Sequence, residues 1–330
     1  MSTSRVFRRL NSNQAARQQI DNYFTYFKTP VALRPLIYRQ RNANTLLAMD
    51  LQDPETKLPM KPKNPIASVS KQTLVDYVKS IPNGSNEFFE WLKPWMKLTT
   101  RKKEIYQYFS AQHLQTMLIQ SCYVIGDYTR MVGYLYTQRP RFIQAQNSNI
   151  YDVDHFFNTL LMCSLQRGSI LEFDDPTIAR KKVQQMWSNT VNKEQTLGLT
   201  SLLVNCYAKQ QGFESQDLIK GLNEVKINLP SRDGITEETQ QKFLTTNESL
   251  YMICRTILQF FPEQDAEIAR FVNDYKSLNS KAGNTNDIYD DYVVSMKKIW
   301  TVKKEERAAR NAKKPVESQQ ETDNSTVAKE

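Results

Sequence analysis

Apolar residues recur along the middle of this 330-residue chain at a regular spacing. Leucine-led apolar pairs begin at Leu118, Leu160 and Leu202, each 42 residues after the one before. A related pair precedes them at Leu74, and another follows at Leu250. Each pair lies in a segment whose apolar side chains are three and four positions apart, which is the pattern of an amphipathic helix. A repeat length of about 20–50 residues indicates stacked helical units that bury their apolar faces against one another.

A cysteine and a glycine accompany the repeated pairs. A cysteine follows each of the last four pairs by three or four residues, at Cys122, Cys163, Cys206 and Cys254. A glycine then follows the first three of these, at Gly126, Gly168 and Gly212, and each is expected to form the turn after its helix. The alternative is a set of ordinary amphipathic helices, whose cores commonly contain leucine and cysteine. The joint recurrence favours a true repeat, in which the cysteines occupy equivalent core positions.

A second amphipathic helix is expected after each turn. Asp127 can cap one such helix, and Asp175 followed by Pro176 is a strong start signal for another. Further second helices are expected over residues 86–96, from Ser215 to Pro230 and from Pro262 through Tyr275. Alternating strand patterns are scarce. The expected fold class is therefore all-α, built from stacked helical hairpins.

Basic residues concentrate at the N-terminus. Residues 1–41 hold eight basic side chains and one acid, Asp21, and so contribute +7 of the formal net charge of +9. The first twenty residues contain arginine and serine but no acid and no long apolar stretch, which is the profile of a mitochondrial targeting segment. The alternative is a basic arm that binds nucleic acid directly. The remaining chain is close to neutral.

Composition divides the chain into four parts. We expect a basic arm with the candidate targeting segment over residues 1–49 and a proline-rich connector over residues 50–69. A helical-repeat array follows over residues 70–295, and a charged helix with a tail over residues 296–330. Four prolines predict that the connector is extended and poorly helical. The tail has almost no apolar content from Pro315 on, which predicts disorder in isolation.

Three groups of basic residues are candidates for contact with RNA phosphates, and the smallest is the pair Arg139 and Arg141 on either side of Pro140. Aromatic and basic residues alternate between positions 23 and 41, where rings can stack on bases and cations can bind phosphates. The alternative for this group is a strap that packs its aromatic rings on the body. Five cations between positions 93 and 103 occur without an acid among them, whereas a solvated helix face more often alternates in sign. The candidate RNA-binding residues are Arg34, Arg39, Arg41, Lys93, Lys97, Arg101, Lys102, Lys103, Arg139 and Arg141.

The sequence contains no recognisable catalytic motif. His113 and His155 lie on expected helices among apolar neighbours, which favours a core or surface role over metal binding. The cysteines are 41, 43 and 48 residues apart, so no closely spaced pair exists for zinc or redox chemistry. No phosphate-binding glycine loop is present, and no apolar run approaches the ~18 residues that span a bilayer. We therefore predict no enzymatic activity, cofactor, metal, small-molecule substrate or membrane span.

Two segments resemble the first helix and turn of pentatricopeptide-type repeats. They are HFFNTLLMCSLQRGS, residues 155–169, and TSLLVNCYAKQQGFE, residues 200–214. In that family the residue before the leucine pair often helps to read an RNA base, and the corresponding residues here are Met117, Thr159, Ser201 and Ser249. Methionine cannot form the hydrogen bonds that a base edge offers. The resemblance therefore implies a degenerate pentatricopeptide-like solenoid that contacts proteins and the RNA backbone.

The basic arm, the degenerate array and the charged tail together resemble a small-subunit protein of the fungal mitochondrial ribosome. The resemblance implies a structural role in the mitochondrial matrix, with ribosomal RNA and neighbouring ribosomal proteins as partners. One alternative is a free mitochondrial RNA-binding factor for the stability or translation of specific transcripts, which needs hydrogen-bonding residues at each repeat. The other is a protein-only assembly scaffold, which uses the array without RNA.

Overall fold

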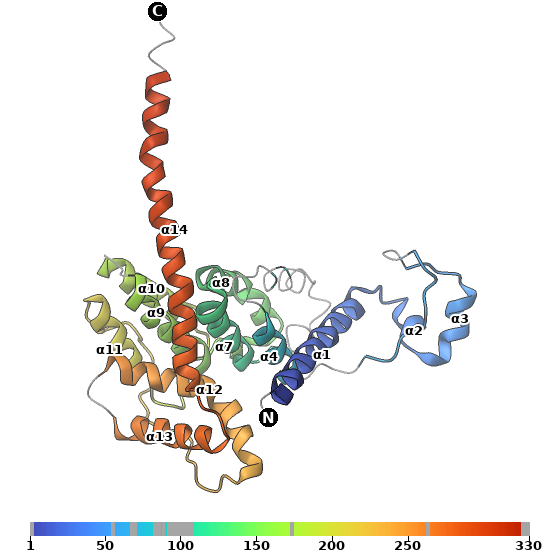
Figure 1. The fold of residues 1–330 in the computed structure, drawn as a ribbon, viewed down its shortest axis with the longest axis horizontal. Helices are drawn as coiled ribbons and strands as arrows, with labels where there is room; N and C mark the ends of the chain where they lie inside the picture. Colours follow the sequence, from blue (N-terminus) through green and yellow to red (C-terminus); the bar gives the residue numbers. More distant parts are fainter. Residues whose placement is uncertain are drawn as a thin grey trace, which may run out of the picture. The chain divides into compact units, whose positions relative to one another are not determined.

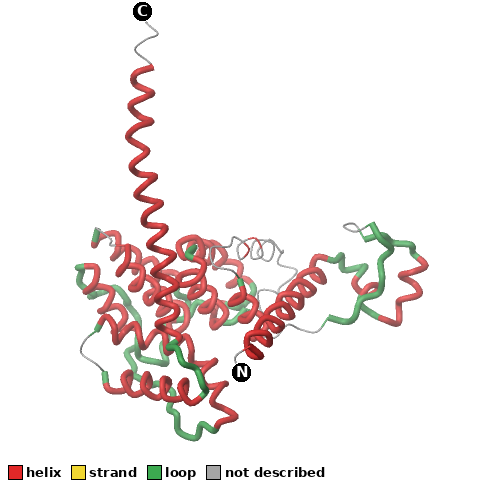
Figure 2. Tube along the Cα trace, in the orientation of Figure 1, coloured by secondary structure: helices red, strands yellow, loops and turns green. Residues whose placement is uncertain are grey.

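Helices are the regular elements of the residues that the structure describes (Figures 1 and 2). This computed structural model describes residues 3–53, 57–66, 71–81, 109–171, 175–261 and 265–324, together with Glu87 and Glu90. In these ranges the only extended pairing is an isolated antiparallel bridge between Gln52 and Pro59. The predicted all-α class is therefore confirmed. The chain forms two compact units, residues 1–81 with 86–113 and residues 82–85 with 114–330.

A long helix and a shorter one pack together in the first unit. α1 (Thr3–Lys28) packs against α4 (Lys71–Ser80). Ala16 and Ile20 of α1 are buried, and so is Tyr77 of α4. Residues four apart on a helix lie on the same face, so Ala16 and Ile20 present one apolar surface.

Short helices and a folded-back loop make a small separate core after α1. The short helices are α2 (Arg34–Ile37), η1 (Gln40–Asn42) and α3 (Ala43–Ala48). Their buried side chains are Ile37, Tyr38 and Leu46. Partly buried apolar residues from α1 and from the following loop surround these three.

In its described residues, 50–53 and 57–66, the predicted proline-rich connector contains no helix, but it folds back onto this small core instead of extending away from it. The Met60 N–H donates to the Leu51 carbonyl at 2.7 Å, and the Lys63 N–H donates to the Ile37 carbonyl at 2.8 Å. The side chains of Leu51, Met60 and Ile66 pack on the core. Burial of this apolar surface stabilises the folded-back path and brings Lys63 next to α2.

Stacked helices make up the second unit. In order they are α7 (Ala111–Gln120), η3 (Ser121–Ile125), α8 (Tyr128–Gln144), η4 (Ser148–Ile150), η5 (Val153–Phe157), α9 (Asn158–Leu171), α10 (Pro176–Asn189), α11 (Thr200–Gln211), α12 (Glu237–Phe260), α13 (Ala266–Lys281) and α14 (Ile288–Asn324). The π-helical turns η3 and η5 are continuous with α7 and α9. α9 is central, because it contacts α11, α12 and α14 (Figure 1).

The repeated cysteines lie on the first helix of each repeat, as predicted. All four are free and buried. Cys122 Sγ lies 3.8 Å from the Cys163 carbonyl oxygen, so two consecutive repeats meet at these positions. The similarity to pentatricopeptide repeats in particular stays a prediction.

Two of the three repeat glycines end their helices. Gly126 and Gly212 have φ values of +83° and +73°, in the left-handed region that favours glycine. Gly168 instead lies inside α9, so the turn predicted there is wrong. A Cβ at Gly168 would lie 2.5 Å from Gln210 Oε1 of α11. This glycine therefore permits the close approach of α9 and α11.

The helix predicted over residues 215–230 is also wrong. Asp217 and Gly221 adopt positive φ values of 63° and 81°, which interrupt helical geometry. The segment forms turns and an irregular stretch that lies along the loop before α11. The Asn228 N–H donates to the Leu197 carbonyl at 3.2 Å. Hydrogen bonds to this loop thus replace those of a second helix.

The other helix starts follow the sequence more closely. The Asp175 carboxylate accepts hydrogen bonds from two backbone N–H groups in the first turn of α10, as predicted. α8 starts after Asp127, but this carboxylate accepts from Lys303 Nζ at 3.1 Å and caps nothing. α13 is capped by Asp265, and Pro262 lies outside the described residues.

α14 packs on η3, α9 and α12 and then continues beyond them (Figure 1). The buried Trp300 donates from Nε1 to the Cys122 carbonyl at 2.9 Å. α14 starts before the charged helix predicted from residue 296, because Tyr289 gives its first turn a buried apolar side chain. It also runs past Pro315, and so differs from the disorder predicted there. The glutamate, glutamine and lysine residues around Pro315 favour helix and oppose the cost of a proline inside it.

Candidate nucleic-acid interface

Half of the candidate RNA-binding cations lie outside the described residues. These are Lys93, Lys97, Arg101, Lys102 and Lys103. The helix predicted over residues 86–96 lies largely outside them as well. The remaining candidates are Arg34, Arg39 and Arg41 in the first unit, and Arg139 and Arg141 in the second.

Arg34 is built into the fold at the end of α1. Its Nε donates to the Thr29 carbonyl at 3.0 Å, and its Nη2 donates to the Phe27 carbonyl at 2.9 Å. The guanidinium carbon lies 4.9 Å from the centre of the Tyr26 ring. Cationic side chains stabilise helix C-termini by hydrogen bonding to the last carbonyls. Arg34 therefore holds the α1–α2 junction and carries a charge that no described carboxylate pairs with.

Exposed cations occur on the elements next to this junction and on the loop that folds back toward α2. We name them the N-terminal cation cluster: Lys28, Arg39, Arg41, Lys57, Lys61 and Lys63. Within the described part of the first unit, none of the six forms an ion pair. The three lysines come from the folded-back loop, so sequence reasoning did not count them as candidates. The apolar positions Leu51, Met60 and Ile66 are the signal that could have shown the fold-back.

A cleft of about 410 Å³ opens next to Arg34, and we name it the α1–α2 cleft. It is lined by Tyr26, Val31, Arg34, Pro35, Tyr38, Arg39, Pro65 and Ile66. The Tyr26 and Tyr38 rings meet edge to face, with centroids 4.9 Å apart. The lining contains aromatic, apolar and cationic side chains and no acid.

Arg139 and Arg141 do not form one site. Two positions on an α-helix differ by about 200° in direction, so these side chains leave α8 on opposite sides. Arg139 Nε donates to the Asn189 carbonyl at 3.0 Å, at the end of α10. Arg141 is exposed. Arg139 therefore joins two helices, and Arg141 is the better placed of the pair to meet a partner.

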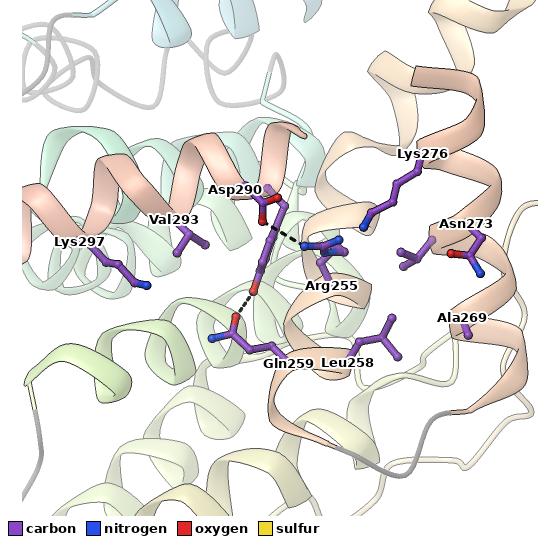
Figure 3. Close-up of a pocket in the computed structure, with 11 residues that line it drawn as sticks. Arg255, Leu258, Gln259, Ala269, Asn273, Lys276, Asp290, Val293 and Lys297 are labelled. Atoms are coloured by element: carbon purple, nitrogen blue, oxygen red, sulfur yellow. Dashed lines mark hydrogen bonds and ion pairs between the residues drawn. The ribbon is translucent and has the colours of Figure 1, made fainter. Parts of the chain in front are cut away.

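A second cleft, of about 520 Å³, lies between α12, α13 and α14 (Figure 3). Its central cation, Arg255, pairs with Asp290 at 3.1 Å and with Asp287 at 3.2 Å. Lys276 also pairs with Asp287, at 3.5 Å. The Tyr289 hydroxyl donates to Gln259 Oε1. These ion pairs connect the three helices. Because carboxylates already neutralise the central cations, the cleft offers little attraction to phosphate.

Removing Arg255 is expected to destabilise the second unit. The Arg255 side chain is 18% exposed, and its loss leaves the Asp287 carboxylate with weaker compensation. Breaking a buried pair from one side costs about 3–5 kcal/mol, so Arg255→Met at this partly buried site should cost about 1–3 kcal/mol. Lys276→Met, at a 45% exposed side chain, should cost less than about 1 kcal/mol. Urea unfolding midpoints measure the stability loss of both variants. Equal losses would contradict the assignment of Arg255 as the central ion-pair partner of Asp287.

The cysteine thiols are placed for packing. Burial raises the pKa of Cys206 to about 11 and raises that of Cys254 as well. Thiols with raised pKa values stay protonated near neutral pH and are poor nucleophiles. Across the ranges that the structure covers, no set of three His, Cys, Asp or Glu side chains is placed to hold a metal ion. The described helices include none with the length and apolarity to cross a bilayer.

His155 is expected to give folding stability a pH dependence. Burial lowers its pKa, but the hydrogen bond and charge of Asp152, 2.8 Å from Nδ1, raise the pKa above 6.5 overall. The protonated form is thus favoured in the folded state. The contribution of the His155–Asp152 pair to folding stability is fully present below the unfolded pKa of about 6.5, and it is lost as the pH rises through the folded pKa.

The variant His155→Gln should remove this component of the pH dependence. The His155 side chain is 36% exposed, so solvent screening keeps the contribution below about 1 kcal/mol. Urea midpoints on both sides of the transition, at about pH 5.5 and pH 8.5, measure it in both proteins. An unchanged pH dependence in His155→Gln would show that this pair does not contribute.

Two family models match this chain, and the boundary between them falls at the end of α4. The MRP13-like N-terminal domain matches residues 1–80, and the MRP13-like C-terminal domain matches residues 85–310. The gap between the two matches adjoins Ile81, where the first segment of the first unit ends. Since the matches cover most of its length, the chain belongs to the MRP13-like family, a family of small-subunit proteins of the mitochondrial ribosome.

Proposed function

We propose that this protein is a structural component of the small subunit of the mitochondrial ribosome, located in the matrix. In this role it binds the backbone of ribosomal RNA and contacts neighbouring ribosomal proteins, without catalysing a reaction. The observation that carries the proposal is the family match over both parts of the chain, residues 1–80 and 85–310.

The N-terminal cation cluster supports contact with RNA phosphates. Its six side chains are exposed and have no ion-pair partner among the described residues. Lysine and arginine that neutralise phosphates release bound counterions, and this release supplies much of the affinity for nucleic acid. Arg141 and the five cations between residues 93 and 103 are further proposed contacts.

Exposed apolar side chains support contact with neighbouring proteins. Leu47, Met49 and Leu58 of the first unit are exposed. Val302 of α14 is also exposed, beyond the buried Trp300. Exposed apolar surface of this kind is typical of interfaces that are covered in an assembly.

The repeat surface argues against a free factor that reads one base per repeat. Of the four positions that would face bases, Met117 and Thr159 are completely buried, whereas Ser201 and Ser249 are partly exposed. The Thr159 hydroxyl already accepts a hydrogen bond from Gln115 Nε2 at 3.0 Å. Buried side chains cannot reach base edges, so at least two of the four repeats cannot read a base in this way, which favours the ribosomal role over one-base-per-repeat reading.

Depletion of the protein distinguishes a ribosomal component from a free transcript-specific factor. Loss of a ribosomal component should lower the amount of assembled mitochondrial small subunits and reduce translation of every mitochondrial transcript together. Loss of a free factor should affect one or a few transcripts and leave small subunits at normal levels. Normal small subunits after full depletion would therefore overturn the proposal.

A further inference from the structure

We infer that the α1–α2 cleft binds one unpaired nucleotide of single-stranded RNA, with the base inside the cleft and its phosphates on the N-terminal cation cluster. This inference rests on the proposed function and adds to it a site that contacts a base.

The walls of the cleft suit a flat aromatic ligand. Its volume of about 410 Å³ lies within the range of about 300–1,000 Å³ that small-molecule sites occupy. The partly exposed Tyr26 supplies aromatic surface, and Pro35, Pro65 and Ile66 supply apolar surface, while Tyr38 lines the cleft as a largely buried residue of the small core. Proteins that bind single-stranded RNA stack splayed bases on aromatic rings and on arginine guanidinium planes.

The Arg34 guanidinium in the cleft is fixed before any ligand enters. Two carbonyl groups, those of Thr29 and Phe27, hold the Arg34 guanidinium, and its Nη1 group has no acceptor among the described residues. The Tyr26 and Tyr38 hydroxyls likewise form no hydrogen bond within the described part of the first unit. Groups held in advance lose little conformational entropy on binding, so they are available to a base edge at low cost.

The charge around the cleft favours RNA over a peptide. No acidic residue lines the cleft, and Arg39 is exposed at its edge. Lys63 is held beside α2 by its backbone hydrogen bond to Ile37. A strand with one phosphate per nucleotide can contact several of these cations at once while one base occupies the cleft. An acidic peptide is the competing ligand class.

The test uses two variants with equal charge change. Val31→Glu places an acid at the cleft, at a side chain that is 72% exposed. Leu58→Glu makes the same change at a 64% exposed side chain of the folded-back loop that does not line the cleft. Both positions are exposed, so both full-length variants should fold, which circular dichroism checks. Each protein is titrated with an oligoribonucleotide of about eight residues and with an abasic strand of equal length.

The unaltered protein is expected to bind the base-bearing strand about tenfold more tightly than the abasic strand. This ratio should fall to about one in Val31→Glu and persist in Leu58→Glu. Equal binding of the two strands by the unaltered protein, or a ratio that survives in Val31→Glu, would overturn the inference. Tighter binding of an acidic peptide than of the base-bearing strand would overturn it in favour of a protein ligand. A protein that still co-sediments with the small subunit in any of these cases leaves the proposed function intact.

Discussion

Reversing the charge of Arg41, Lys57, Lys61 and Lys63 to glutamate is expected to weaken binding to small-subunit ribosomal RNA by on the order of 100-fold. These side chains are exposed, and no described carboxylate pairs with them, so their charge is available to phosphate. Each lost phosphate contact should also reduce the slope of log affinity against log salt by about one. None of the four lines the α1–α2 cleft, so the variant tests backbone contact separately from base contact.

A matched variant controls for total charge. Lys209, Lys226, Lys242 and Lys281 are exposed lysines of the second unit, and their reversal changes the net charge equally. Filter binding over a range of about 50–200 mM salt measures affinity and slope for both proteins. The control should keep most of its affinity and nearly its full slope. Equal losses in the two variants would show that net charge, and not the N-terminal cation cluster, determines binding.

Gly198→Ala is expected to be the most damaging single small substitution in the second unit. Gly198 has φ = +74°, and a Cβ there would lie 2.8 Å from each of the Val225 and Lys226 carbonyl oxygens. These are backbone atoms of the irregular segment that replaces the predicted helix, and they cannot rotate away. Left-handed strain and overpacking together should cost about 2–4 kcal/mol.

Gly234→Ala separates the two contributions. Gly234 has φ = +77°, but nothing lies within 4 Å of a Cβ there. Only the left-handed backbone is penalised, so this variant should lose about 1 kcal/mol. Urea unfolding with an unchanged m-value gives both free energies. If Gly198→Ala lowers the free energy of unfolding no more than Gly234→Ala does, residues 225–227 do not pack closely on Gly198 as described.

Sequence patterns predicted the fold best where a local signal determines the structure. The carboxylate of Asp175 before Pro176 gives a helix start, and the structure has one there. The apolar pairs predicted the first helices, because burial of a helix face depends on a spacing that the sequence displays. Gly168 was misassigned, since a glycine that ends a helix and one that admits a neighbouring helix look alike in sequence.

The candidate interface was only partly predictable for a related reason. Arg39 and Arg41 stand out because aromatic residues alternate with them, and both are exposed. Lys61 and Lys63 join them only because residues far along the chain fold back, through the backbone pairing of Lys63 with Ile37. Arg139 looked equivalent to Arg141, yet it hydrogen-bonds to the Asn189 carbonyl, a long-range contact that no local pattern reveals.

Sedimentation of the tagged protein from a mitochondrial lysate tests the central claim most directly. The lysate is run through sucrose gradients with magnesium present, and again at a salt concentration that removes loosely bound RNA-binding proteins. We predict that the protein migrates with the small ribosomal subunit under both conditions. Migration at the top of the gradient, or release by salt while the subunit stays intact, would contradict a built-in ribosomal role.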